Sequence, residues 1–141
     1  MSDNLELAPG IYRIESAKWV GQVVTVGRPN AIDGFQKGLV GGVQAWLIRY
    51  NETGLATFQG RSADAPDGKF IAVDWSDSTL FYDDTPSSFI LRRIGDYVAV
   101  CMETPEGVLA WQLPSPENGT PIKLDSLDSD VKFKWRFELL N

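Results

Sequence analysis

Short runs of apolar or alternating residues recur along the whole chain, and residues that favour turns separate them. Such runs are typical of β-strands, whereas an amphipathic helix would place apolar residues every three or four positions. Only residues 121–133 approach a helical period, and their apolar spacing is irregular. The pattern therefore predicts an all-β protein with twelve strands, at residues 10–17, 21–27, 37–42, 43–51, 54–61, 69–75, 79–84, 87–95, 96–104, 108–114, 119–127 and 132–140.

One sequence pattern occurs three times: an aromatic residue followed by aliphatic and charged residues. The aromatic positions are 43 and 46 residues apart, and each lies about three strands after a strand that begins a new group of four. A large side chain that returns at the same place in each group is expected to fill the core. The three predicted core residues are Trp46, Phe89 and Trp135.

Twelve strands in three groups of four predict a β-trefoil, in which six strands close a barrel and three hairpins cap it. Closure removes the open sheet edges that would otherwise invite aggregation. The prediction is a single domain over residues 1–141, with repeats at roughly 10–51, 54–95 and 96–140. A β-sandwich could also use twelve short strands but would not explain the threefold recurrence. A four-bladed propeller would need a fourth group.

The net charge of −6 limits the classes of partner. Nucleic-acid binding calls for a basic face, so we expect no nucleic-acid partner. An acidic chain of this kind is expected to be a soluble monomer. The N-terminal residues lack the basic and apolar regions of a secretory signal, and no apolar run approaches the ~20 residues of a membrane span. We therefore expect a cytoplasmic protein with no membrane partner.

The chain contains no histidine and a single cysteine, Cys101. Histidine is the commonest general base near neutral pH and the commonest metal ligand. Its absence excludes a Ser-His-Asp triad, a Cys-His pair and a histidine-based zinc site. We expect no catalytic residue, no cofactor and no metal site, and hence no enzyme. Asp125, Asp128 and Asp130 lack the spacing of a calcium loop and are expected to form a solvated turn. Cys101 lies in an apolar run and is expected to be buried.

Gln44, Ala45 and Trp46 match the Gln-x-Trp motif of ricin-type β-trefoil lectins. In those lectins the motif normally recurs in each repeat, whereas the other two copies here read Ser-Ser-Phe and Phe-Lys-Trp. Three further tryptophans are not all needed for the core, and an exposed one beside a loop would suit a sugar platform or a protein contact. Carbohydrate binding is therefore an alternative function, with these tryptophans as candidates: Trp19, Trp75 and Trp111.

The chain resembles the fungal β-trefoil protease inhibitors, the group that holds the mycocypins and mycospins of mushrooms. The resemblance rests on the opening "LAPGIYRIESA", on a "VGR" before an asparagine-bearing loop, and on the closing "KWRFELL". It implies a β-trefoil that inhibits a protease reversibly through a surface loop, and members of the family use different loops for different proteases. We favour a trypsin-like serine protease as the partner, and inhibition of cysteine or asparaginyl proteases remains open.

Within this resemblance, the stretch "GRPNAIDGF" is the predicted inhibitory loop. Such a loop enters the protease cleft as a substrate would, and pre-shaping lowers the entropy cost of binding. Pro29 fixes its own φ and biases Arg28 toward an extended backbone, while Gly27 and Gly34 are expected to permit sharp bends.

A bond that precedes proline is a poor trypsin site, so Asn30 is the expected primary specificity residue. The flanking contacts are expected from Arg28, Pro29, Ala31 and Ile32. An ordinary surface loop is the alternative interpretation. Rival inhibitory loops carry residues 61–68, residues 51–54, and Lys123 or Lys132.

Overall fold

The structure, a computed structural model, describes the whole chain except residues 1–4, 6, 39–41, 63–66 and 141. The described residues form thirteen strands and one turn of 3-10 helix, η1 (Val131–Phe133). The strands are β1 (Gly10–Ser16), β2 (Gln22–Arg28), β3 (Ala31–Gln36), β4 (Ala45–Tyr50), β5 (Ala56–Arg61), β6 (Phe70–Asp74), β7 (Thr79–Asp83), β8 (Ile90–Ile94), β9 (Tyr97–Thr104), β10 (Gly107–Gln112), β11 (Thr120–Pro121), β12 (Lys123–Ser126) and β13 (Trp135–Leu139).

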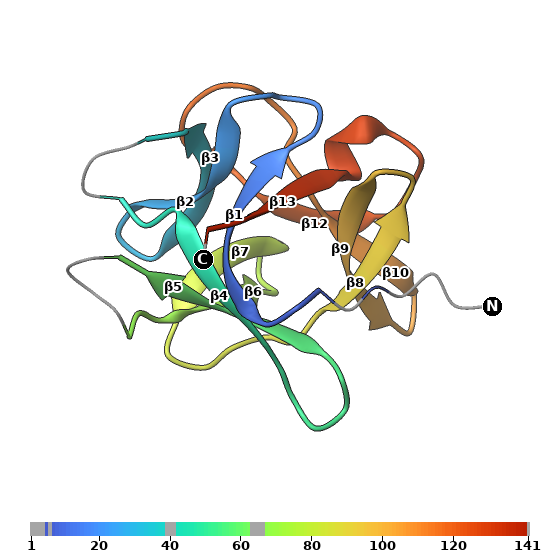
Figure 1. The fold of residues 1–141 in the computed structure, drawn as a ribbon. Coiled ribbons are helices and arrows are strands. Elements are labelled where there is room, and N and C mark those ends of the chain that lie inside the picture. Colours follow the sequence, from blue (N-terminus) through green and yellow to red (C-terminus); the bar gives the residue numbers. More distant parts are fainter. Residues whose placement is uncertain (1–4, 6, 39–41, 63–66, 141) are drawn as a thin grey trace.

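Six strands close a barrel. Strand β1 lies between β13 and β4, as Figure 1 shows, and the pairing continues from β4 to β5. An isolated bridge from Ala56 to Phe89 links β5 to the start of β8, and β8 pairs with β9, which returns to β13. The ring leaves none of these six strands as an open edge.

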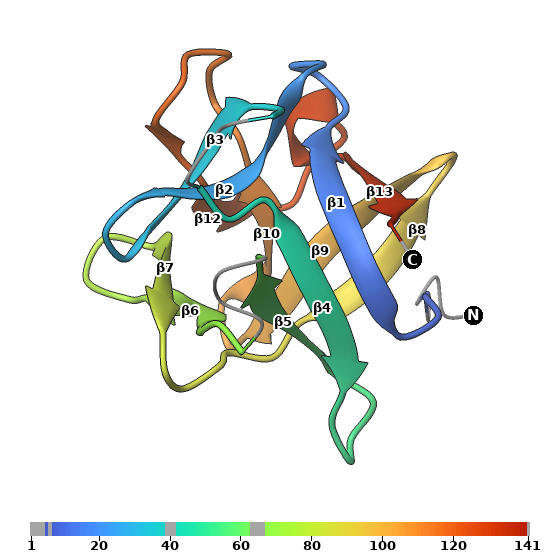
Figure 2. The same cartoon turned by 60° about the vertical axis from the view of Figure 1, so that its left-hand side comes forward.

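Three hairpins cap the barrel: β2–β3, β6–β7 and β10–β12. Single pairs of residues connect them to one another, Ala31 with Phe81 and Lys123 with Thr79. In Figure 2 the strands β2, β3, β6, β7 and β12 lie together on the left of the barrel strands β1 and β13. A six-stranded barrel with three capping hairpins is a β-trefoil, so the predicted fold class is confirmed.

The core contains the three aromatic residues that the repeat pattern predicted. Trp46, Phe89 and Trp135 are fully buried in the main hydrophobic cluster. The indole N–H of Trp46 donates to the carbonyl of Val24 at 3.0 Å, and that of Trp135 donates to the carbonyl of Trp111 at 3.1 Å. Each of these two tryptophans therefore fills the barrel with its indole N–H paired, as is usual for buried polar groups.

The second hairpin strand of the first repeat was predicted in the wrong place. We expected a strand at residues 37–42, but β3 occupies Ala31–Gln36, residues 37 and 38 form a turn, and residues 39–41 lie outside the described part. The polar Asp33 and the glycine at position 34 hid the strand pattern. In the fold both residues are buried. The carboxylate of Asp33 pairs with Arg28, and Gly34 packs against the side chain of Leu113.

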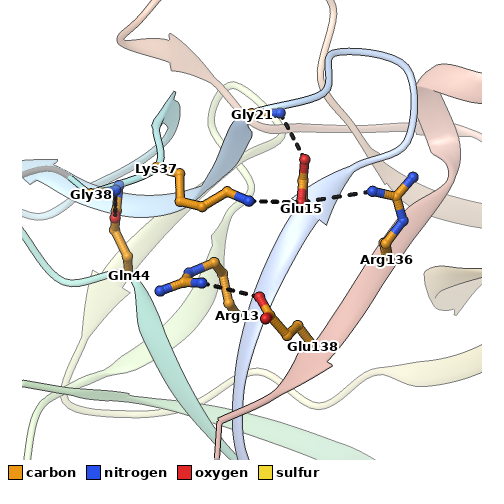
Figure 3. A network of polar contacts seen from close by, with 8 residues as sticks. All are labelled: Arg13, Glu15, Gly21, Lys37, Gly38, Gln44, Arg136 and Glu138. Carbon is orange, nitrogen blue, oxygen red and sulfur yellow. Dashed lines mark hydrogen bonds and ion pairs between the residues drawn. The ribbon is translucent and has the colours of Figure 1, made fainter.

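A polar network holds the first repeat against the last (Figure 3). The buried carboxylate of Glu15 in β1 accepts a hydrogen bond from the N–H of Gly21 at 2.7 Å. It also lies 3.5 Å from the ammonium of Lys37 and 3.8 Å from the guanidinium of Arg136. A buried carboxylate is tolerated when it is paired and hydrogen-bonded. Glu15 thus connects the β1–β2 turn, the end of β3 and strand β13.

Candidate functional site

The predicted inhibitory loop is a tight hairpin turn. Only Pro29 and Asn30 stand between β2 and β3, and both are exposed. Asn30 has a φ of +61°, a left-handed conformation that asparagine tolerates better than most residues. Its carbonyl accepts a hydrogen bond from the N–H of Tyr82 at 3.0 Å. The extended loop expected between residues 27 and 34 is therefore replaced by a two-residue turn that is fixed to the β6–β7 hairpin.

Arg28 neutralises a buried carboxylate. Its guanidinium donates two hydrogen bonds to Asp33, from Nε to Oδ2 at 2.9 Å and from Nη2 to Oδ1 at 2.9 Å. Asp33 is 1% exposed, and its hydrogen bond and charge raise the pKa of Arg28. A bidentate pair of this kind holds both side chains in one geometry. The charge of Arg28 is thus already matched within the hairpin.

Two of the predicted contact residues lie inside the hairpin. The side chain of Ile32 is 1% exposed and belongs to the core, so the expected contact from Ile32 is not supported. Ala31 is half-buried and pairs with Phe81 of β7. Alternation along a strand sends neighbouring side chains to opposite faces, which is why Ile32 points inward directly after an exposed turn. Arg28, Pro29 and Asn30 are the members of the predicted set that remain exposed.

The glutamine of the Gln-x-Trp motif has a structural role. The amide nitrogen of Gln44 donates to the carbonyl of Gln36 at 2.8 Å and to the hydroxyl of Thr25 at 3.1 Å. Its amide oxygen accepts from the N–H of Gly38 at 2.9 Å, as Figure 3 shows. An amide offers two donors and one acceptor oxygen, and all are used here. Gln44 therefore fastens the β2–β3 hairpin to the start of β4.

Of the three tryptophans considered as a binding platform, Trp75 is the exposed one. Trp111 is fully buried, and half-buried Trp19 donates its indole N–H to the carbonyl of Leu113 at 2.9 Å. Trp75 is 57% exposed at the β6–β7 turn. An exposed indole offers a flat apolar face and a polar N–H, against which a partner can pack.

Two aspartates fix the turn that carries Trp75. The carboxylate of Asp74 accepts hydrogen bonds from the N–H and hydroxyl of Ser76, at 3.0 and 2.6 Å. The carboxylate of Asp77 does the same for Thr79, at 3.2 and 2.6 Å. The two hydrogen bonds from Ser76 lower the pKa of Asp74. Side-chain bonds to the backbone two residues later stabilise turns, so the main chain on both sides of the indole is ordered.

A groove of about 510 Å³ lies between Trp75 and the β9–β10 hairpin. Met102 and Leu109 are cross-strand partners in that hairpin, and both pack against the core. The exposed Glu103 and Glu106 and the Thr104–Pro105 segment line the remainder. The volume falls within the ~300–1,000 Å³ of small-molecule sites, which combine apolar surface with a few polar groups. Such a groove can pack against the apolar face of a ligand and accept its hydrogen bonds.

Sequence reasoning identified only part of this groove. It singled out Trp75 together with Trp19 and Trp111 but could not tell which of them is exposed. Its predicted strands at residues 96–104 and 108–114 leave a short connection between them, without any sign that this connection lies beside Trp75. The signal that could have found the groove is a tryptophan next to two turn-forming aspartates, because such a position is at the surface.

No group of three or more His, Cys, Asp or Glu side chains in the described part of the chain could hold a metal ion. No helix there is long and apolar enough to cross a membrane.

No model of a known protein family matches the sequence, and no curated protein matches it. Solved structures do match the fold. The Macrolepiota procera ricin B-like lectin in complex with lactose has a TM-score of 0.79 and 16% identity, over 96% of this chain and 99% of the lectin. The Rhizoctonia solani agglutinin has a TM-score of 0.74 and 18% identity, over 96% and 98%.

A mosquitocidal holotoxin also contains this fold, with a TM-score of 0.78 and 16% identity. The match covers 96% of this chain but 18% of the toxin. At these identities the likeness supports the β-trefoil fold alone. The resemblance to protease inhibitors gains no support from these structures, two of which are a lectin and an agglutinin of fungi.

Proposed function

We propose that the protein binds carbohydrate in the groove between Trp75 and the β9–β10 hairpin. The observation that carries the proposal is the 57% exposed indole of Trp75 beside an apolar floor. The fold similarity to a lectin in complex with lactose and to an agglutinin is consistent with it. Gln44 does not take part, because its amide is fully hydrogen-bonded within the protein.

The chemistry of the groove suits a pyranose ring. A sugar presents C–H groups on its ring face and hydroxyls around its edge. The indole and the side chains of Met102 and Leu109 offer apolar surface for that face. At the end of the hairpin, the hydroxyl of Thr104 and the carboxylate of Glu106 can accept hydrogen bonds from sugar hydroxyls. Because the Trp75 turn is already ordered, binding does not have to order it.

The test is a glycan array followed by titration of any bound glycan, with the parent protein, Trp75→Ala and Val20→Ala. Val20 is 71% exposed and is not part of the groove, so it controls for loss of an exposed apolar side chain. We expect Trp75→Ala to weaken binding at least tenfold, about 1.4 kcal/mol. Val20→Ala should bind like the parent. Both variants should unfold within about 0.5 kcal/mol of the parent, because both positions are exposed.

Binding by Trp75→Ala at the parent level would overturn this site. An array on which the parent protein binds no glycan would overturn the function.

Protease inhibition is the second candidate, favoured by the exposed and well-fixed tip at Pro29 and Asn30. The φ of +61° at Asn30 differs from the extended backbone of a substrate, so a substrate-like mode is not favoured there. The same samples, together with Asn30→Ala, should be assayed against trypsin, papain and an asparaginyl endopeptidase. Inhibition that is lost in Asn30→Ala and kept in Trp75→Ala would assign inhibition to the β2–β3 turn.

A further inference from the structure

Asn118 is the only asparagine in the chain that is followed by a glycine. Glycine has no side chain to hinder its own backbone nitrogen, so an Asn-Gly pair can close a succinimide ring more easily than other pairs. Asn118 is exposed in the loop 114–119, which connects β10 to β11. We propose that Asn118 is a site of spontaneous deamidation and that the β2–β3 hairpin controls its rate. This inference does not depend on carbohydrate binding.

The reaction needs only water besides the groups of this chain. The backbone nitrogen of Gly119 attacks Cγ of Asn118, so that an N–Cγ bond forms and the Cγ–Nδ2 bond breaks. Ammonia leaves and takes the proton of the Gly119 N–H. Water then opens the succinimide ring. Attack at Cγ gives aspartate, whereas attack at the main-chain carbonyl gives isoaspartate, in which the main chain runs through Cγ.

In the folded protein, both reacting groups are hydrogen-bonded to the hairpin. The N–H of Gly119 donates to the carbonyl of Gly34 at 2.9 Å. The Oδ1 of Asn118 accepts from the N–H of Gln36 at 2.9 Å and from Nε2 of Gln22 at 3.0 Å. The nitrogen must give up its proton to attack, and Cγ must turn toward that nitrogen. These three bonds oppose both steps, so the folded state slows the reaction.

We expect deamidation to proceed through local opening of the loop. Other hydrogen bonds of this segment run within it, from the N–H of Glu117 to the hydroxyl of Ser115 and from the N–H of Thr120 to the carbonyl of Glu117. Such bonds do not attach the loop to the barrel. Exposed loops open with free energies below that of global unfolding. The rate in the folded protein is then the rate in the open chain multiplied by the open fraction.

The two products should differ in how well they fit the fold. Aspartate keeps the acceptor oxygen, and a carboxylate accepts hydrogen bonds more strongly than an amide. The Nδ2 of Asn118 makes no hydrogen bond within the described residues, so its loss breaks none of them. Isoaspartate adds one methylene to the main chain and shortens the side chain. The bonds to Gly34 and Gln36 then lose their present geometry, and the loop should separate from β3.

The experiment measures deamidation at mildly alkaline pH in the native protein and in the full chain unfolded by guanidinium chloride. Peptide mass spectrometry locates the modified residue, and an isoaspartate assay identifies the second product. Asn118 should deamidate at least tenfold faster in the unfolded chain, which corresponds to an opening free energy of about 1.4 kcal/mol or more.

Two matched variants test the role of the hairpin. Gln22→Ala removes the side-chain donor to Asn118 and should speed deamidation of the native protein about two- to tenfold, the effect of one hydrogen bond. Gln36→Ala is the control, because its donor is the backbone N–H, which the variant keeps. Its native rate should equal that of the parent. Neither variant should change the rate in the unfolded chain. Asn118→Asp should unfold at the same denaturant concentration as the parent or at a higher one.

Each other result decides against the inference. If Asn118 stays unmodified even in the unfolded chain, it is not a deamidation site. Equal rates in the native and unfolded parent would show that the fold exerts no control. A native rate of Gln22→Ala that equals the parent rate, or equal acceleration in both glutamine variants, would overturn the role of the Gln22 bond. A lower unfolding midpoint for Asn118→Asp would overturn the distinction between the two products.

Discussion

Gly34 tests whether a glycine in the β2–β3 hairpin is needed for its backbone or for its lack of a side chain. The sequence predicts that Gly34 permits a sharp bend. In the structure, however, Gly34 lies inside β3 and is not among the glycines with positive φ. A Cβ built at position 34 would lie 2.7 Å from both Cδ atoms of Leu113. Leu113 is fully buried, so it cannot move into solvent. Close packing is therefore the reason for glycine here.

We expect Gly34→Ala to lower the free energy of unfolding by about 1–3 kcal/mol, the usual cost of an overpacked core. Leu113→Ala alone should cost about 2–5 kcal/mol through the cavity that it leaves. In the double variant the new methyl group occupies part of that cavity. The two changes should then be non-additive by about 0.5–3 kcal/mol, with the double variant more stable than the sum predicts.

The assay is urea unfolding, monitored by tryptophan fluorescence, of the parent, the two single variants and the double variant. The slope of the unfolding free energy against urea concentration should be the same for all four proteins, so that a shift in midpoint reports a change in stability. Gly54→Ala is the matched control, because Gly54 has a φ of +79° and nothing within 4 Å of its Cβ position. Its cost comes from the backbone, so Leu113→Ala should not relieve it. Full stability of Gly34→Ala, or additivity with Leu113→Ala within about 0.5 kcal/mol, would refute the packing argument.

Two further predictions concern buried side chains. Trp135→Ala should lower the free energy of unfolding by about 3–5 kcal/mol, because it removes a fully buried indole that contacts Trp111. A decrease in that free energy of less than about 1 kcal/mol, in the same urea assay, would contradict this. Burial raises the pKa of the Cys101 thiol from 9.0 to about 11. Because the thiolate is the reactive form, a thiolate-directed reagent at neutral pH should label the native protein slowly and the unfolded protein fast. The unfolded chain loses this proton first as the pH rises, so stability should fall between about pH 9 and 11. Equal labelling rates for native and unfolded protein would show that Cys101 is accessible.

The sequence by itself determined the fold class and its threefold division. Strand periodicity is local: alternate residues face the same side whatever the strand packs against. The recurrence of an aromatic residue in each group then placed Trp46, Phe89 and Trp135 in the core, because a repeat that closes on itself puts equivalent residues in equivalent places. The burial of Cys101 followed from its apolar run in the same local way.

The tertiary structure alone decided which polar and small residues are buried and which tryptophan is exposed. Asp33 and Gly34 belong to a strand because Arg28 neutralises the carboxylate and Leu113 fills the space beside the glycine. Leu113 is far from Gly34 in sequence, so no local pattern contains that pair. Trp75 and Trp111 both adjoin apolar strand residues in the sequence, yet one is exposed and the other is fully buried. Their difference depends on neighbours from other repeats, and only closure of the barrel brings those neighbours together.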